Sequence, residues 1–171
     1  MSNGDEFFRR DDMILPPQYL KRIIDVVFNV ITHGKEAGFF DGREPWGWFC
    51  LARKSGAAAL SFAVEDPLGQ SVDPFHHYQR CAEQQTAWLS VPKQHSMTSS
   101  LWEENSSDAV AVTGYDFYFS YASGLSRQWN EAIVVAVAMR MHQFNPRVID
   151  TWPLRDNLHI KQLLEVAHWT E

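Results

Sequence analysis

The sequence feature that most constrains the fold is a helical segment near the C-terminus in which no polar side chain occurs between Ala132 and Met139. Ser126 precedes this run and is placed to accept a hydrogen bond from the first-turn amides, as an N-cap residue does. A helix on the surface of a domain has one apolar stripe and one polar face. A helix without a polar face must be buried on all sides, or one side must meet another molecule.

Two arrangements satisfy this requirement. In the first, one side of residues 132–139 covers a sheet and the other contacts a neighbouring subunit, which predicts a homo-oligomer assembled through this helix. In the second, the protein is a monomer and the C-terminal segment from Val148 to Val166 covers the second side. The sequence leaves both arrangements open.

The rest of the chain shows two strand pairs, each followed by a helix. An order of this kind predicts an α+β fold, with a mainly antiparallel sheet, helices packed on it and a C-terminal extension. The expected elements are a helix at 18–34, strands at 46–53 and 57–65, a helix at 73–89, strands at 109–113 and 115–122, the apolar helix, an extended piece at 147–152 and a last helix at 157–168.

The length of 171 residues indicates one domain with one sizeable core. Polar residues dominate up to Asp12, and two prolines at 16 and 17 disfavour helix before them. We therefore expect a flexible arm over residues 1–17 and a single α+β domain over residues 18–171. The polar stretch 93–107 is expected to be a long loop, and loops of that length are often functional.

The charge pattern argues against two classes of partner. There are 15 Lys and Arg against 21 Asp and Glu, a net charge of −6, and no basic run exceeds Arg9 and Arg10. Such a chain repels a phosphate backbone on average, so nucleic-acid binding is not expected. The first residues carry charges where a signal peptide needs an apolar region, and no window approaches the ~20 apolar residues that span a bilayer. The sequence predicts no membrane association and a cytoplasmic location.

The densest group of chemically active side chains is His76, His77 and Cys81. His77 and Cys81 are four residues apart and share one helix face, which suits two soft metal ligands or a thiol activated by an imidazole. His76 points about 100° away from that face. A metal would need a third ligand from elsewhere, such as His95 or Glu65. A structural role is the simplest interpretation of an isolated pair, because free cysteines are commonly buried.

Alternating aromatic residues mark two of the expected strands. Trp46, Trp48 and Phe49 open the first strand, and aromatic residues alternate from Tyr115 to Tyr121. They could line a pocket for a flat ligand, but alternation of this kind is first of all typical of a sheet face that packs on helices.

The stretch "SYASGLSRQWNEAIVVAVAM", the helix "DPFHHYQRCAEQQTAWLS" after the first strand pair and the order of elements resemble the GlcG-type proteins, known as haem-binding or haem-degrading. The resemblance covers residues 18–142 in topology and rests on Ser123, Gly124, Leu125 and the helix behind them. It implies a profilin-like fold (α-β-β-α-β-β-α), self-assembly and a small-ligand or sensory role. If the ligand is haem, His76 or His77 would supply the axial imidazole, because the start of a helix favours its neutral form.

These observations predict a non-enzymatic, oligomeric small-ligand-binding or sensory domain, with haem as one candidate ligand. A first alternative is a protein that binds a protein partner, in the manner of an inhibitor or immunity protein, which suits an acidic, aromatic-rich chain. A second is a small thiol-dependent enzyme with Cys81 as nucleophile and His77 as base. No phosphate loop, Ser/His/Asp order or zinc motif is present in the sequence.

Overall fold

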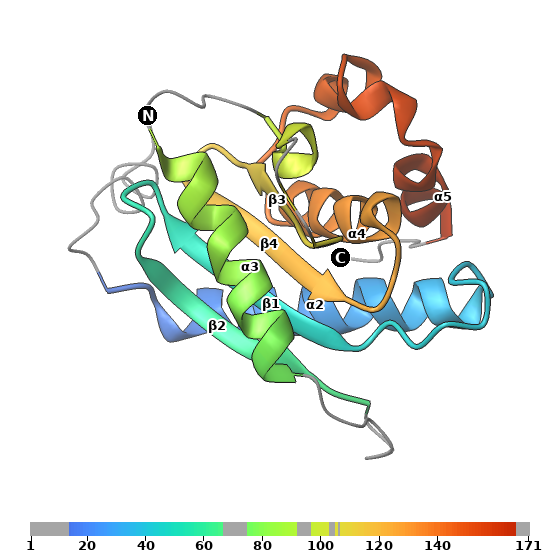
Figure 1. Cartoon of the computed structure of the whole chain (residues 1–171), viewed down its shortest axis with the longest axis horizontal. Coiled ribbons are helices and arrows are strands. Elements are labelled where there is room, and N and C mark those ends of the chain that lie inside the picture. The colour runs from blue at the N-terminus through green and yellow to red at the C-terminus, as the bar shows by residue number, and fades with distance from the viewer. Residues whose placement is uncertain (1–13, 67–74, 92–96, 103–104, 106, 167–171) are drawn as a thin grey trace.

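The computed structural model describes residues 14–66, 75–91, 97–102, 105 and 107–166. It contains a four-stranded antiparallel sheet in the order β2-β1-β4-β3, with helices on both faces (Figure 1). The predicted α+β class and order of elements are therefore confirmed. In chain order the elements are α2 (Pro17–Glu36), β1 (Gly47–Arg53), β2 (Ala58–Val64), α3 (Phe75–Ser90), the 3-10 helix η1 (Ser99–Leu101), β3 (Val110–Thr113), β4 (Phe117–Ser123), α4 (Arg127–Arg140), the 3-10 helices η2 (Pro146–Asp150) and η3 (Leu154–Asp156), and α5 (Leu158–Val166).

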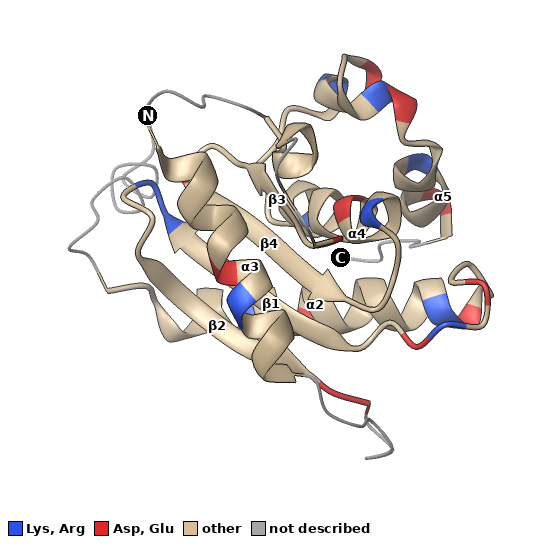
Figure 2. Cartoon of the chain, viewed as in Figure 1, with Lys and Arg blue, Asp and Glu red and all other residues tan. Residues whose placement is uncertain are grey.

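The sheet has two chemically different faces because side chains alternate along each strand. One face carries Phe49, Leu51, Phe119 and Tyr121, all fully buried in the main core with α2 and α4. The opposite face carries small side chains, such as Ala111, together with the larger Trp48 and Tyr118, and packs against α3. Of all the strand residues, only Arg53 at the end of β1 is charged (Figure 2). Of the predicted aromatic series, Phe117, Phe119 and Tyr121 lie on the sheet face that packs on helices, whereas Tyr115 precedes β4 and is exposed.

The apolar helix lies between the sheet and the C-terminal segment. Every residue of α4 from Trp129 to Ala138 is buried. One side of the helix packs on β3, β4 and α2, and the other packs on α5 (Figure 1). The C-terminal segment thus covers the second side of this helix, as the second arrangement expects. The predicted homo-oligomer through residues 132–139 gains no support, because residues 132–138 are buried within one chain and Met139 is half-buried.

The segment expected to be extended at 147–152 is instead η2, continued by η3. Asn145 accepts a hydrogen bond from the amide of Arg147 at 3.0 Å, and Pro146 occupies the first helical position. An N-cap followed by proline is a helix start signal, and here it outweighs the β-branched residues that follow. The side chains of Val148 and Ile149 pack against the main core.

Several predicted boundaries fall outside the described residues. These are residues 1–13 of the arm expected at 1–17, and the helix start at Asp73 and Pro74. In the described part of the arm, Leu15 is buried in the core and Pro17 begins α2. Of the loop expected at 93–107, the described part includes η1, which is capped by the Thr98 hydroxyl. No helix in the described ranges combines the length and apolar character that crossing a membrane requires.

Candidate functional site

Three segments far apart in the sequence meet at a pocket of about 310 Å³. The first turns of α3 form one wall, the residues before β3 form a second, and the end of β4 with the turn that follows forms a third. The lining side chains that carry polar or reactive groups are those of His77, Tyr78, Cys81, Ser107, Asp108 and Ser123. The pocket thus joins the predicted His77 and Cys81 pair to the Ser123 and Gly124 turn.

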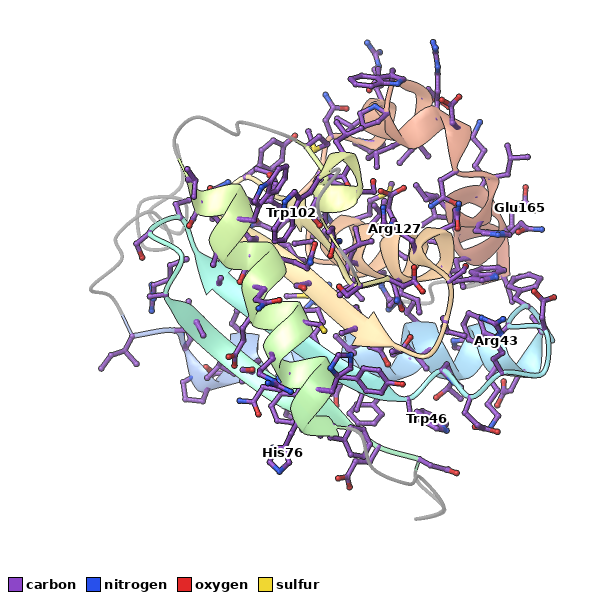
Figure 3. The ribbon with its side chains drawn as sticks, in the orientation of Figure 1. Arg43, Trp46, His76, Trp102, Arg127 and Glu165 are labelled. Carbon is purple, nitrogen blue, oxygen red and sulfur yellow. The ribbon has the colours of Figure 1, made fainter. Side chains whose placement is uncertain are left out.

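The pair has the geometry that its spacing predicts. The Sγ atom of Cys81 lies 3.6 Å from Nε2 of His77, within reach of a sulfur hydrogen bond. Cys81 is 7% exposed, while His77 is exposed at the rim. His76 points away from the body of the protein into solvent and does not line the pocket (Figure 3). The structure therefore separates the two candidate haem ligands.

The local sequence explains this placement. Cys81, Ala82 and Leu89 belong to the buried face of α3, which packs on small side chains of the sheet such as Ala122. Small residues on both sides allow a close approach of helix and sheet. His77 lies one turn before Cys81 on the same side of the helix, and there the sheet face ends at the pocket.

Asn130, fully buried in the first turns of α4, fixes the mouth of the pocket. Its side-chain oxygen accepts a hydrogen bond from the Ser123 hydroxyl at 2.6 Å, and its amide nitrogen donates to the carbonyls of Asp108 at 3.0 Å and Leu125 at 3.4 Å. The same Ser123 hydroxyl accepts from the amide of Leu125 at 3.1 Å. One amide side chain therefore holds two walls of the pocket together.

Arg127, labelled in Figure 3, lies one turn earlier on α4 and fixes the loop before β3. Its guanidinium donates to the carbonyl oxygens of Asn105 at 3.2 Å and Ser107 at 3.0 Å. The sequence analysis missed Arg127, Asn130 and Asp108. The sequence did carry one signal: Arg127 and Asn130 are polar residues at the start of an otherwise apolar helix. Polar groups that become buried in such a helix need hydrogen-bond partners, which these two find in the neighbouring loops.

Burial shapes the ionisation of the groups around the pocket. It raises the pKa of the Tyr78 phenol, and the charge of a Cys81 thiolate raises it further. Cys50 lies in the same buried cluster as Cys81, and burial raises the pKa of its thiol to about 11. Both cysteines are free. Cys50 is therefore a protonated thiol at neutral pH and does not line the pocket.

The described residues offer no third metal ligand beside His77 and Cys81. No group of three or more His, Cys, Asp or Glu side chains within the described ranges is arranged to hold a metal ion. Glu65 is exposed and does not line the pocket, and His95 lies outside the described residues. The predicted metal alternative gains no support.

A second buried polar group anchors the C-terminal segment. Glu131 of α4, 5% exposed, accepts hydrogen bonds from the hydroxyls of Thr98, at 2.7 Å, and Ser100. Its other oxygen accepts from the side-chain amide of Asn157 at 3.0 Å, just before α5. This carboxylate joins η1, α4 and the start of α5, and it helps to explain why α5 covers α4.

Comparison of the chain with protein-family models, with curated proteins and with solved structures found no match. The resemblance to GlcG-type proteins therefore stays a prediction. The function must be argued from the chemistry of the site, because one fold supports many functions.

Proposed function

We propose that this protein is a non-enzymatic domain that binds a small polar molecule in the pocket between α3 and the turn after β4. The observation that carries the proposal is the buried support of that pocket by Asn130 and Arg127. Fully satisfied buried polar networks give a unique, rigid geometry, which a preformed binding site requires. The proposal uses no oligomer interface on residues 132–139, because residues 132–138 are buried within one chain.

The lining groups define the class of ligand. An imidazole, a phenol, a carboxylate and a thiol point to a molecule that both donates and accepts hydrogen bonds, and Asp108 favours a neutral or cationic one. The volume of about 310 Å³ lies at the lower end of the range for small-molecule sites. The ligand is therefore the size of an amino acid, an amine or a small sugar.

Haem fits this pocket poorly. A haem site needs an axial imidazole inside a large apolar pocket. His77 is the only histidine among the described lining residues, and Ser107, Asp108 and Ser123 make the surroundings polar. A haemin titration followed by the Soret band tests this directly, with His76→Ala as the matched control for His77→Ala. A Soret shift that His77→Ala abolishes and His76→Ala retains would make haem the ligand in place of a smaller molecule.

The proposal is tested by thermal unfolding in the presence of a library of small amines, amino acids and polyols. Gly124→Val places a side chain at the mouth, because a Cβ at Gly124 would lie 3.3 Å from the Tyr78 hydroxyl oxygen. A ligand of the pocket should raise the thermal midpoint of the wild type and of His76→Ala, and raise that of Gly124→Val much less. Compounds that stabilise all three proteins equally bind elsewhere. A library without a pocket-dependent compound would count against the proposal.

The 3.6 Å contact between Cys81 and His77 favours a second candidate, a thiol-dependent enzyme. In that role Nε2 of His77 takes the proton from the Cys81 thiol, and the thiolate attacks an electrophilic substrate carbon. This candidate predicts that iodoacetamide labels Cys81 faster than a free thiol at pH 7, and that His77→Gln removes the advantage. Labelling no faster than a free thiol would leave only the binding proposal.

A further inference from the structure

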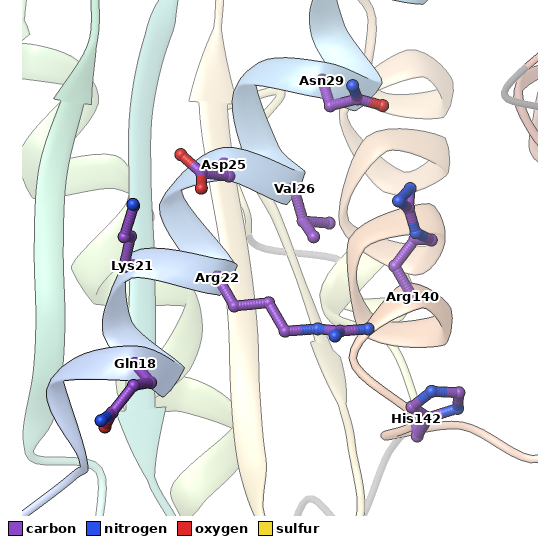
Figure 4. Close-up of a pocket in the computed structure, with 8 residues that line it drawn as sticks. All are labelled: Gln18, Lys21, Arg22, Asp25, Val26, Asn29, Arg140 and His142. Carbon is purple, nitrogen blue, oxygen red and sulfur yellow. The ribbon is translucent and has the colours of Figure 1, made fainter. Parts of the chain in front are cut away.

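A second and larger cavity, of about 800 Å³, lies between α2 and the end of α4. It is separate from the pocket lined by His77 and Cys81, which we call the thiol pocket. Figure 4 shows the guanidinium of Arg22 reaching from α2 toward the end of α4, where Arg140 and His142 lie. Lys21 extends from another side of α2 at the rim (Figure 4). Lys21, Arg22, Arg140 and His142 therefore gather at one cavity.

This concentration of positive charge runs against the composition of the chain. The net charge is −6, yet Asp25 is the one carboxylate among the described residues that line the cavity. Neither Lys21 nor Arg22 forms an ion pair with any other residue in the described part of the chain. The neighbouring positive charges of Lys21 and Arg22 repel each other, and a bound anion relieves the repulsion.

The end of α4 does not by itself account for these cations. A helix C-terminus carries about half a negative charge, which the last-turn residue Arg140 offsets. The last carbonyls are also occupied, because the amides of Met141, His142 and Gln143 donate to the carbonyls of Val137, Met139 and Ala138. The positive charges of Arg22 and Lys21 are therefore not needed to offset the partial negative charge at the end of α4.

His142 adds an observation from the backbone. It ends α4 in the left-handed region, with φ of 56°, at the position where a helix of this ending usually has glycine. A residue with a Cβ is unfavourable there, and such residues concentrate at binding sites. The imidazole of His142 is thereby held at the wall of the cavity.

We propose that the cavity between α2 and the end of α4 binds a small oxyanion, a phosphate or a polycarboxylate, at the guanidinium of Arg22, with Lys21 adding positive charge at the rim. Planar guanidiniums bind these groups through paired, charge-assisted hydrogen bonds. Asn29 and Gln18 supply amide donors at the rim, and Val26 supplies an apolar wall. These contacts suit an organic anion with a short carbon body.

The test is isothermal titration of the wild type with inorganic phosphate and with citrate at low ionic strength, each compared with sodium chloride at equal ionic strength. Arg22→Gln removes an exposed guanidinium of the cavity, and Arg43→Gln makes the same change at an exposed turn residue outside it. Arg22→Gln should weaken binding at least about tenfold, as the loss of one charge-assisted contact does, while Arg43→Gln stays within about twofold. The preferred probe distinguishes phosphate from carboxylate.

His142→Gly is a second test, in which anion affinity and thermal stability should change in opposite directions. It keeps the left-handed backbone and removes the imidazole, so anion binding should weaken while the thermal midpoint stays equal or rises. The proposal is overturned if neither probe binds the wild type more tightly than chloride, or if Arg22→Gln and Arg43→Gln weaken binding equally. Wild-type affinity in His142→Gly would remove His142 from the site.

Discussion

The replacement Asn130→Ala tests the support of the thiol pocket in one step. It deletes the acceptor of the Ser123 hydroxyl and the donor to the carbonyls of Leu125 and Asp108. Asp108 is exposed and its carbonyl can bond to water, whereas Ser123 and Leu125 are buried. The Ser123 hydroxyl loses the acceptor of its proton and the buried Leu125 carbonyl loses this donor, at about 1–3 kcal/mol each, so we expect a loss of about 2–6 kcal/mol. That is a large share of the 5–15 kcal/mol typical of a domain.

Urea unfolding followed by circular dichroism measures this loss, and an unchanged dependence on urea concentration shows that only stability changed. The control Asn145→Ala removes one hydrogen bond at the exposed start of η2 and should cost about 1 kcal/mol or less. Because Asn130 holds two walls of the pocket, Asn130→Ala should also accelerate iodoacetamide labelling of Cys81 in the native state. A stability loss below about 1 kcal/mol, or an unchanged labelling rate, would refute the reasoning.

Three further predictions concern α4 and the buried thiol. Glu131→Ala should destabilise the protein by about 2–5 kcal/mol in urea unfolding, because the Thr98 hydroxyl and the Asn157 amide lose their acceptor. Glu131→Gln keeps one acceptor oxygen, so it should cost less than half as much. Val135→Lys places a charge at a position that is 0% exposed and should unfold the chain, seen by circular dichroism; a folded species of lower mass in light scattering would restore the oligomer interface. The pKa of Cys50 is raised to about 11 in the folded protein, so the thiol of the unfolded chain loses its proton at lower pH. The free energy of unfolding should therefore fall by about 2–3 kcal/mol as pH rises from about 9 to 11. Cys50→Ala should abolish this part of the decline.

The sequence predicted what depends on local signals. The strand pairs, the turn at Gly56 and the helix faces are each encoded within a few residues, and so is the shared face of His77 and Cys81. The residues missed at the pocket, Arg127 and Asn130, act on loops at least five residues away in the chain, and up to 22 residues away. Nothing in a single stretch marks such contacts.

The apolar helix α4 also shows that contacts between distant residues cannot be predicted from one stretch of sequence. Its composition required cover on every side but could not say whether the cover came from another subunit or from the same chain. The choice depended on the Glu131 carboxylate and on Asn157, a pair 26 residues apart that joins the C-terminal segment to α4. Arg22 and Arg140, which line the second cavity, likewise belong to helices far apart in the sequence, α2 and α4. Their proximity in space was therefore not predictable from the sequence.

The central claim is that the thiol pocket admits small molecules to Cys81 in the folded protein. The most direct measurement is the rate of iodoacetamide labelling at each cysteine, resolved by peptide mass spectrometry, with Cys50 as the internal control. The pKa of about 11 lowers the thiolate fraction of Cys50 about 100-fold at neutral pH relative to an ordinary thiol, and Cys50 is 0% exposed. We predict that Cys81 labels at least about tenfold faster than Cys50 under native conditions. Equal rates, both limited by global unfolding, would contradict the claim.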